Sequence, residues 1–166
     1  MPRRVFYSFH YQPDNWRASQ VRNIGAVEGN QPARDNDWET IAKGDAGIER
    51  WITDQMIGRT CTVVLVGSQT AGRKWIDHEI VKSWKDGLGV AGLYIHGLQD
   101  RGGNISGAGS NPFAHFTFGP QGKRMSDVVK TYNPPGANSR ERYAWIGENL
   151  SAIIEAAISI RRNFGG

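Results

Sequence analysis

Cysteine is nearly absent from this sequence, since Cys61 is the single one among 166 residues. A lone cysteine excludes an intrachain disulfide and any metal site built from several cysteines, and it suits a reducing compartment. Long apolar runs are missing too, because nothing approaches the roughly 18 consecutive apolar residues of a membrane-spanning helix. The opening MPRRVFYSFHY is too short and too polar for a signal peptide. We therefore expect a cytoplasmic protein that does not span a membrane.

Several ligand-binding patterns are also absent. The four histidines share no spacing typical of metal ligands, so no metal site is expected. No G-x-G-x-x-G follows an expected strand, which argues against a dehydrogenase-type cofactor site. The net charge is +4, but the basic residues are scattered and no basic run carries interleaved aromatics. Nucleic-acid binding is therefore not expected, and a small anionic ligand accounts for the charge as well.

What the chain does contain is typical of one globular domain, expected over residues 1–166. Hydrophobic residues make up 39% and charged residues 22%, which is enough apolar surface for one sizeable core. The run CTVVLV at residues 61–66 is continuous and β-branched, as in a strand buried on both faces of a parallel sheet. After it, Ile76, Ile80 and Trp84 recur at helical spacing, and Gly87 ends that helix.

Strands and helices are expected to alternate along the chain. Further strands are predicted at residues 5–9, 89–95 and 125–132, and long polar loops at 25–44 and 96–122. Further helices are predicted at residues 15–24, at 45–57 with Asp45 as N-cap, and at 139–163, where Ser139 opens the helix. This order predicts an α/β fold with a mostly parallel sheet and helices on both faces. Ligands of such folds bind beyond the carboxyl ends of the strands, so the loops after residues 9, 66 and 95 should converge on one rim.

Four segments carry a resemblance to a known family. They are VFYSFHY near the start, VVLVGSQTAGRKWIDHEIVKSW, GVAGLYIHGL and the downstream GSNPF. Together they resemble the TIR-like domain of the ThsB family from bacterial Thoeris anti-phage systems, over about residues 4–113. The TIR superfamily carries a Ser-containing loop after a strand, then a Trp four residues before a catalytic Glu. Ser68, Trp75 and Glu79 match this pattern, whereas the second strand of animal and plant TIR domains is not recognisable here.

The resemblance implies a flavodoxin-like TIR fold and an enzyme that acts on NAD. Such an NAD glycohydrolase or ADP-ribosyl cyclase breaks the bond between nicotinamide and ribose, and the Thoeris branch is similar to enzymes that make a cyclic ADP-ribose isomer. That product activates a separate effector protein. The resemblance further implies self-assembly on activation and a phage-derived trigger. NAD is then the substrate, and no cofactor, metal, nucleic acid or membrane is implied.

The residues fit this chemistry without a second carboxylate. Nicotinamide leaves the cationic glycoside as a neutral molecule, so no general acid has to protonate it, in contrast to ordinary glycosidases. The remaining oxocarbenium-like centre benefits from one nearby carboxylate. Glu79, at the edge of the expected buried face of its helix, is the predicted catalytic residue. A solvated helix glutamate is the alternative interpretation of this position.

Six further residues are predicted to bind substrate. They are Phe9, His10, Trp38, Ser68, Trp75 and Asn111. Phe9 and His10 can stack on or hydrogen-bond to the base or the nicotinamide, and Trp38 can stack on adenine. Ser68 offers a hydrogen bond to a ribose or phosphate oxygen. Five of them have a structural alternative: Phe9 in the core, His10 in a loop, Trp38 as a loop anchor, Ser68 in a turn or cap, and Asn111 ordering its loop.

Two other functional classes stay open from the sequence. A TIR-like module that signals by assembly without catalysis fits the unrecognisable second-strand region. An enzyme resembling nucleoside deoxyribosyltransferases also places a Glu on an α/β rim, but uses it as a covalent nucleophile. The products formed from NAD separate the first class from the enzyme, and a trapped ribosyl adduct identifies the second.

Overall fold

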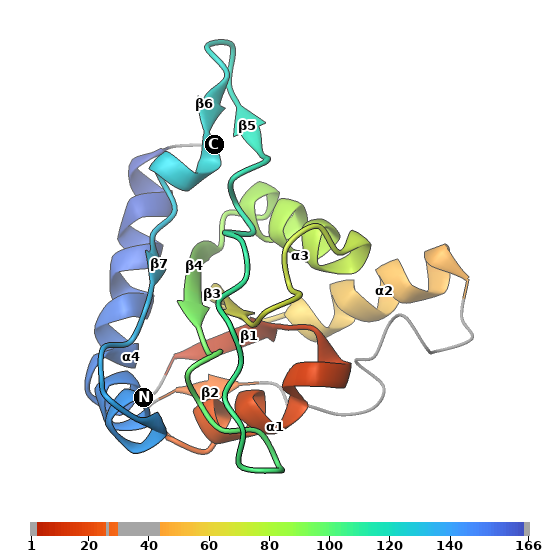
Figure 1. The fold of residues 1–166 in the computed structure, drawn as a ribbon. Helices are drawn as coiled ribbons and strands as arrows, with labels where there is room; N and C mark the ends of the chain where they lie inside the picture. Colours follow the sequence, from red (N-terminus) through yellow and green to blue (C-terminus); the bar gives the residue numbers. More distant parts are fainter. Residues whose placement is uncertain (1–2, 26, 30–43, 165–166) are drawn as a thin grey trace.

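The computed structural model describes residues 3–25, 27–29 and 44–164 (Figure 1). The strands are β1 (Arg4–Ser8), β2 (Glu28–Gly29), β3 (Cys61–Val66), β4 (Gly89–Tyr94), β5 (Thr117–Phe118), β6 (Lys123–Arg124) and β7 (Thr131–Tyr132). The helices are α1 (Tyr11–Arg22), α2 (Asp45–Met56), α3 (Lys74–Lys85) and α4 (Ser139–Asn163). None of the helices in these ranges is long and apolar enough to cross a membrane.

The central sheet is parallel throughout its described strands, which confirms the predicted fold class. Its strand order is β2-β1-β3-β4-β7, and every neighbouring pair runs parallel. This is the flavodoxin-like order, in which the chain reverses its direction of travel across the sheet between β1 and β3. The carboxyl ends of β1 and β3 therefore flank the topological switch point, where ligands of such folds bind.

Residues alternate between the two faces of the sheet. From β3, Cys61, Val63 and Leu65 join an apolar cluster with α1 and α4, whereas Val64 and Val66 pack with α3. Figure 1 shows α4 on one side of the sheet and α2 and α3 on the other. Every residue of β3 is buried, as expected for a central strand covered on both faces.

The first strand and helix differ from prediction at their junction. β1 ends at Ser8, so Phe9 lies beyond it, and α1 begins at Tyr11 rather than residue 15. Pro13 lies in the first turn of α1, where its missing N–H is not needed for an intrahelical hydrogen bond. Strand β2 falls inside the predicted loop at residues 25–44, most of which lies outside the described residues.

The starts of α2 and α4 were predicted to within one residue, but the capping groups differ. Gly44 occupies the N-cap of α2, and the Asp45 carboxylate lies 2.6 Å from Lys74 Nζ instead of capping the helix. Helix α4 is capped by Asn138, whose side chain accepts a hydrogen bond from the Glu141 N–H at 2.9 Å.

The C-terminal region departs most from prediction. The expected strand at residues 125–132 is a 3-10 turn at Met125–Asp127, followed by two buried valines and the two-residue β7. The predicted loop at 96–122 contains β5, which pairs with β6 as an antiparallel hairpin that projects from the body (Figure 1). Short pairings of this kind leave almost no periodic pattern in a sequence.

Candidate active site

Glu79 lies inside the molecule, on the face of α3 that packs against the sheet. Its side chain is 2% exposed, which rules out the solvated helix glutamate considered from the sequence. The Ser8 hydroxyl donates a hydrogen bond to Glu79 Oε1 at 2.6 Å. This length is at the short end of the range for O–H···O hydrogen bonds. The predicted catalytic carboxylate is thus held at the carboxyl end of β1.

Ser8 is a site residue that sequence reasoning missed. It is 1% exposed and follows Phe6 at the two-residue spacing of a strand, so both side chains face α2 and α3. The register pairs Ser8 with Val64 of β3, next to the switch point. The available signal was a serine at an inward-facing position of an otherwise apolar strand.

A second polar bridge joins α3 to the sheet one turn after Glu79. Thr62 Oγ1 and Ser83 Oγ lie 2.7 Å apart, and Ser83 Oγ also donates to the Glu79 main-chain carbonyl at 2.6 Å. Both hydroxyl-bearing residues are fully buried. We call Ser8, Glu79, Thr62 and Ser83 the polar seam. It fixes the height and rotation of α3 relative to β1 and β3.

Trp75 lies on α3, one turn before Glu79, and packs on the side of α3 that faces α2. It is 8% exposed and shares an apolar cluster with Phe6 and Ile52. Its ring lies 5.5 Å from the His78 ring in an edge-to-face arrangement. The indole therefore anchors the start of α3 in the core, and its predicted contact with substrate stays a prediction.

Phe9 and His10 lie at the connection from β1 to α1. Phe9 belongs to the cluster beneath α1 and α4, on the face of the sheet opposite Glu79, which matches the alternative core interpretation. His10 is 7% exposed and occupies the N-cap position of α1, where its carbonyl accepts from the Asp14 N–H at 3.2 Å. Substrate contacts of both residues stay predictions.

Among the predicted site residues that the structure describes, Ser68 is the exposed one. It follows β3, one residue after the buried Gly67, whose N–H donates to Thr70 Oγ1 at 2.8 Å. Thr70 thus shapes the turn and leaves the Ser68 side chain at the surface. This position suits the predicted hydrogen bond to a ligand, which the structure leaves as a prediction.

Asn111 orders the loop in which it lies. Its Oδ1 accepts from the Phe113 N–H at 2.8 Å, and its Nδ2 donates to Thr131 Oγ1 at 3.4 Å. These bonds tie the loop to β7 and match the structural alternative. Trp38 lies outside the described residues.

The three loops predicted to share one rim meet at Gly67. The Asp14 carboxylate from the start of α1 lies against the Gly67 Cα, and Gly109 from the loop after β4 lies against the Gly67 carbonyl. Asp14 is 1% exposed, and this burial raises its pKa to about 6 although the neighbouring Arg17 acts in the opposite direction. The rim is therefore closely packed on the α1 side.

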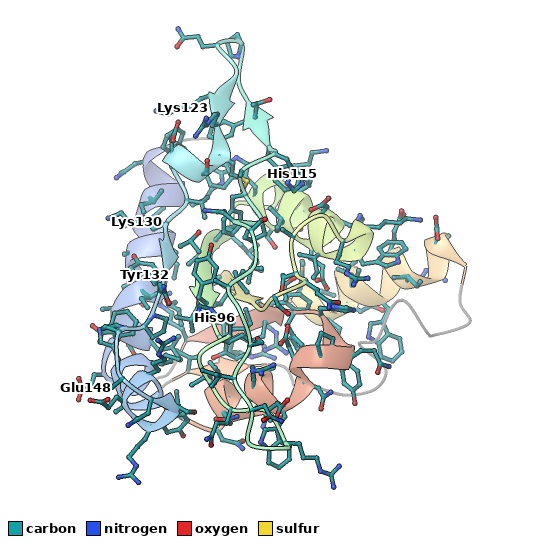
Figure 2. All side chains as sticks on the ribbon, viewed as in Figure 1. His96, His115, Lys123, Lys130, Tyr132 and Glu148 are labelled. Atoms are coloured by element: carbon teal, nitrogen blue, oxygen red, sulfur yellow. The ribbon has the colours of Figure 1, made fainter. Side chains whose placement is uncertain are left out.

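Away from this rim, the described residues form a surface cavity but no metal-binding cluster. Among the described residues, no group of three or more His, Cys, Asp or Glu side chains is arranged to hold a metal ion. A surface cavity of about 440 Å³ lies at the far end of α3, lined by Trp84, Phe118, Phe164 and the labelled Lys123 (Figure 2). None of the predicted site residues within the described ranges lines this cavity.

Comparison with known proteins identifies the family. Residues 6–100 match the family model described as "Thoeris protein ThsB, TIR-like domain". The chain belongs to the ThsB family of TIR-like proteins. A ThsB relative from Bacillus cereus (strain MSX-D12), named "Putative cyclic ADP-D-ribose synthase ThsB1", is 36% identical over 133 residues, covering 75% of this chain and 69% of the relative. The resemblance stated from the sequence is confirmed.

The ThsB match covers the part of the chain that builds the candidate site. It runs from β1 through α3 and β4 and ends inside the following loop, so it includes Ser8, Gly67 and Glu79. Gly109, Asn111 and the hairpin of β5 and β6 lie beyond the matched range. The polar seam is thus part of the ThsB-like region.

Proposed function

We propose that this ThsB-family protein cleaves the bond between nicotinamide and ribose in NAD and closes the ADP-ribose part into a cyclic isomer. The observation that carries this proposal is the buried Glu79 carboxylate beside the switch point. Its Oε1 accepts a hydrogen bond from the Ser8 hydroxyl at 2.6 Å. The name of the Bacillus cereus relative, a cyclic ADP-D-ribose synthase, supports the same reaction class.

In this mechanism Glu79 acts by charge. Positive charge develops on the ribose carbon as neutral nicotinamide leaves, and a fixed carboxylate in a water-poor site stabilises it strongly. The Ser8 hydroxyl holds Oε1 in place before the reaction, so the carboxylate does not need to reorient. The nucleophile is then an atom of the same ADP-ribose unit for cyclisation, or water for hydrolysis.

The other predicted contacts divide into two kinds. Ser68, exposed just after β3, is proposed to donate a hydrogen bond to ribose or pyrophosphate, and His10 and Trp75 are proposed to contact the substrate. Phe9 and Asn111 support the site through packing and loop order. Trp38 is proposed to stack on adenine. NAD is the substrate, and the mechanism uses no cofactor or metal.

The burial of Glu79 points to control by assembly. A carboxylate that is 2% exposed is not accessible to NAD unless neighbouring segments move. We propose that the isolated chain is a resting form and that self-assembly, promoted by a phage-derived trigger, opens the site. The cyclic product then activates a separate effector protein in the cytoplasm. Turnover per molecule should rise with protein concentration, and full activity at high dilution would contradict this control.

Product analysis tests the proposed reaction. Concentrated protein is incubated with NAD, and the small molecules are separated and identified by mass spectrometry. We expect nicotinamide together with a product lighter than ADP-ribose by one water. Unchanged NAD under assembling conditions would favour the non-catalytic interaction module, and a ribosyl adduct on the protein would favour the covalent alternative.

A further inference from the structure

The loop between β4 and β5 is seated on the end of β3 by close backbone contact. A Cβ placed on Gly109 would lie 3.0 Å from both the carbonyl carbon and the carbonyl oxygen of Ser68, and still closer to the Gly67 carbonyl oxygen. Backbone this close leaves no room for a side chain. Gly109 therefore lies directly beside Ser68, at the rim of the proposed NAD site.

Arg17 fastens the first half of the same loop to α1. Its side chain is 3% exposed, and it donates from Nε to the Leu98 carbonyl at 2.8 Å and from Nη2 to the Asn104 carbonyl at 3.0 Å. Its Nη1 donates to Asp14 Oδ1 at 3.2 Å. The three nitrogens of the planar Arg17 guanidinium thus donate hydrogen bonds to two loop carbonyls and to the carboxylate that lies against Gly67.

The clamped segment is ordered internally as well. Asp100 Oδ1 accepts from the N–H groups of Gly102 and Asn104, both at 2.9 Å. The Ser106 N–H donates to the carbonyl of His96, which lies two residues after the end of β4 (Figure 2). Movement of Arg17 would therefore be transmitted through residues 98–106 to the contact at Gly109.

The chemistry gives this contact a consequence. When nicotinamide leaves, it keeps the electron pair of its bond to the ribose carbon. That carbon then accepts an electron pair either from an atom of the same nucleotide, giving the cyclic isomer, or from water, giving ADP-ribose. Either path releases one proton. Which product forms depends on how well the site excludes water while the nucleotide folds back.

We propose that Arg17 is a positioning residue that favours cyclisation over hydrolysis. By holding residues 98–104 on α1, it seats Gly109 against the Gly67–Ser68 backbone and closes the rim to water. Arg17 contacts the loop rather than the reacting atoms, so it acts on the choice of product and little on the loss of nicotinamide. This inference rests on the proposed function.

The test compares product ratios among three variants under assembling conditions. Arg17→Lys keeps the charge beside Asp14 but cannot reach both loop carbonyls, and Gly109→Ala pushes the loop off the end of β3. Gly107→Ala is the matched control, because a methyl group there meets nothing within 4 Å. We expect the ratio of cyclic product to ADP-ribose to fall about fivefold or more in the first two variants. Nicotinamide release per folded molecule should change less than about threefold, and Gly107→Ala should keep the wild-type ratio.

The outcomes separate this inference from the proposed function. Wild-type protein that releases no nicotinamide, or only ADP-ribose, overturns the cyclase proposal and this inference with it. Wild-type protein that cyclises NAD while Arg17→Lys and Gly109→Ala keep its product ratio overturns this inference alone. If Arg17→Lys fails to fold, the Gly109→Ala ratio decides. Faster amide exchange over residues 98–106 in Arg17→Lys, with a lowered ratio, is the supporting result.

Discussion

The two faces of the central sheet are built differently. Beneath α1 and α4, one apolar cluster runs continuously across β1, β3 and β4. Beneath α2 and α3, the apolar residues form two separate clusters, one around Val64 and Ile80 and one around Phe6 and Ile52. The polar seam of Ser8, Glu79, Thr62 and Ser83 bridges the sheet and α3 on this second face.

This difference separates stability from function. Burying a carboxylate and three hydroxyls costs free energy that apolar side chains in the same places would not, even when each polar group is paired. On the α1 and α4 face the buried polar pair of Asp14 and Arg17 lies on α1, and the apolar residues form one continuous core. We infer that the interrupted face is where the protein gives up stability to hold a reactive group. The predictions below test that division.

The largest effect is expected at Glu79. Glu79→Gln keeps the shape and the hydrogen bond from Ser8 but removes the charge, which should cost roughly 3–4 kcal/mol of transition-state stabilisation, about a hundredfold to a thousandfold in NAD turnover. The free energy of unfolding should change by about 1 kcal/mol or less. Nicotinamide release and urea unfolding measure the two quantities.

Glu49 provides the matched control for that substitution. It lies exposed on α2, on the same side of the sheet but away from the seam, so Glu49→Gln should retain activity. Nicotinamide release by Glu79→Gln above about a tenth of the wild-type rate would remove Glu79 from the catalytic role.

The continuous face should show the opposite behaviour. Leu65 is fully buried in the cluster beneath α1 and α4. Leu65→Ala should lower the free energy of unfolding by about 3 kcal/mol through lost apolar burial and the cavity left behind. Turnover per folded molecule should stay close to wild type. A selective loss of turnover, with stability unchanged, would break the division between the faces.

Asp14 lies on the α1 side of the sheet, near the carboxyl ends of the strands. It should make the stability of the protein depend on pH. Burial raises the pKa of Asp14 to about 6, so the folded state holds its proton more tightly than the unfolded state. The stability contributed by the protonated group is present below about pH 4 and is lost as the pH rises through about 6, on the order of 2–3 kcal/mol.

Asp14→Asn isolates this dependence, because the amide does not titrate. Urea unfolding at several pH values between about 4 and 7 should show wild type losing stability relative to Asp14→Asn as the pH rises. The difference removes the contributions of Asp100 and Glu155, whose lowered pKa values act in the opposite sense. A difference that stays constant over this range would contradict the assignment.

The smallest effect is expected at Ser8. Ser8→Ala leaves the Glu79 charge in place but removes the hydroxyl that orients it. A hydrogen bond to a charged group contributes roughly 1.5–3 kcal/mol, so turnover should fall about tenfold to a hundredfold, less than in Glu79→Gln. Steady-state kinetics should place the loss in kcat rather than KM. An unchanged kcat would mean that Ser8 only supports packing.

The elements with a strong periodic signal were predicted correctly from the sequence. The continuous β-branched run gave β3 without error, and the recurrence of Ile76, Ile80 and Trp84 gave α3 with its end at Gly87. The family pattern led to Glu79. These features are local, because the residues that specify each one lie within a few positions of one another.

The unpredicted features depend on contacts between distant segments. The hydrogen bond between Ser8 and Glu79 joins residues 71 positions apart, and the hydrogen bond from Arg17 to the Leu98 carbonyl joins residues 81 positions apart. Neither pairing leaves a repeat in the sequence that local reasoning can detect.

A crystal structure with a non-cleavable NAD analogue tests the central claim most directly. The account predicts the ribose carbon that bears nicotinamide at about 3–3.5 Å from a Glu79 carboxylate oxygen, beside the ends of β1 and β3. It also predicts Gly109 in contact with Gly67 in the complex. An analogue seated instead in the cavity of Trp84, Phe118 and Phe164, with Glu79 still covered and hydrogen-bonded to Ser8, would contradict the account.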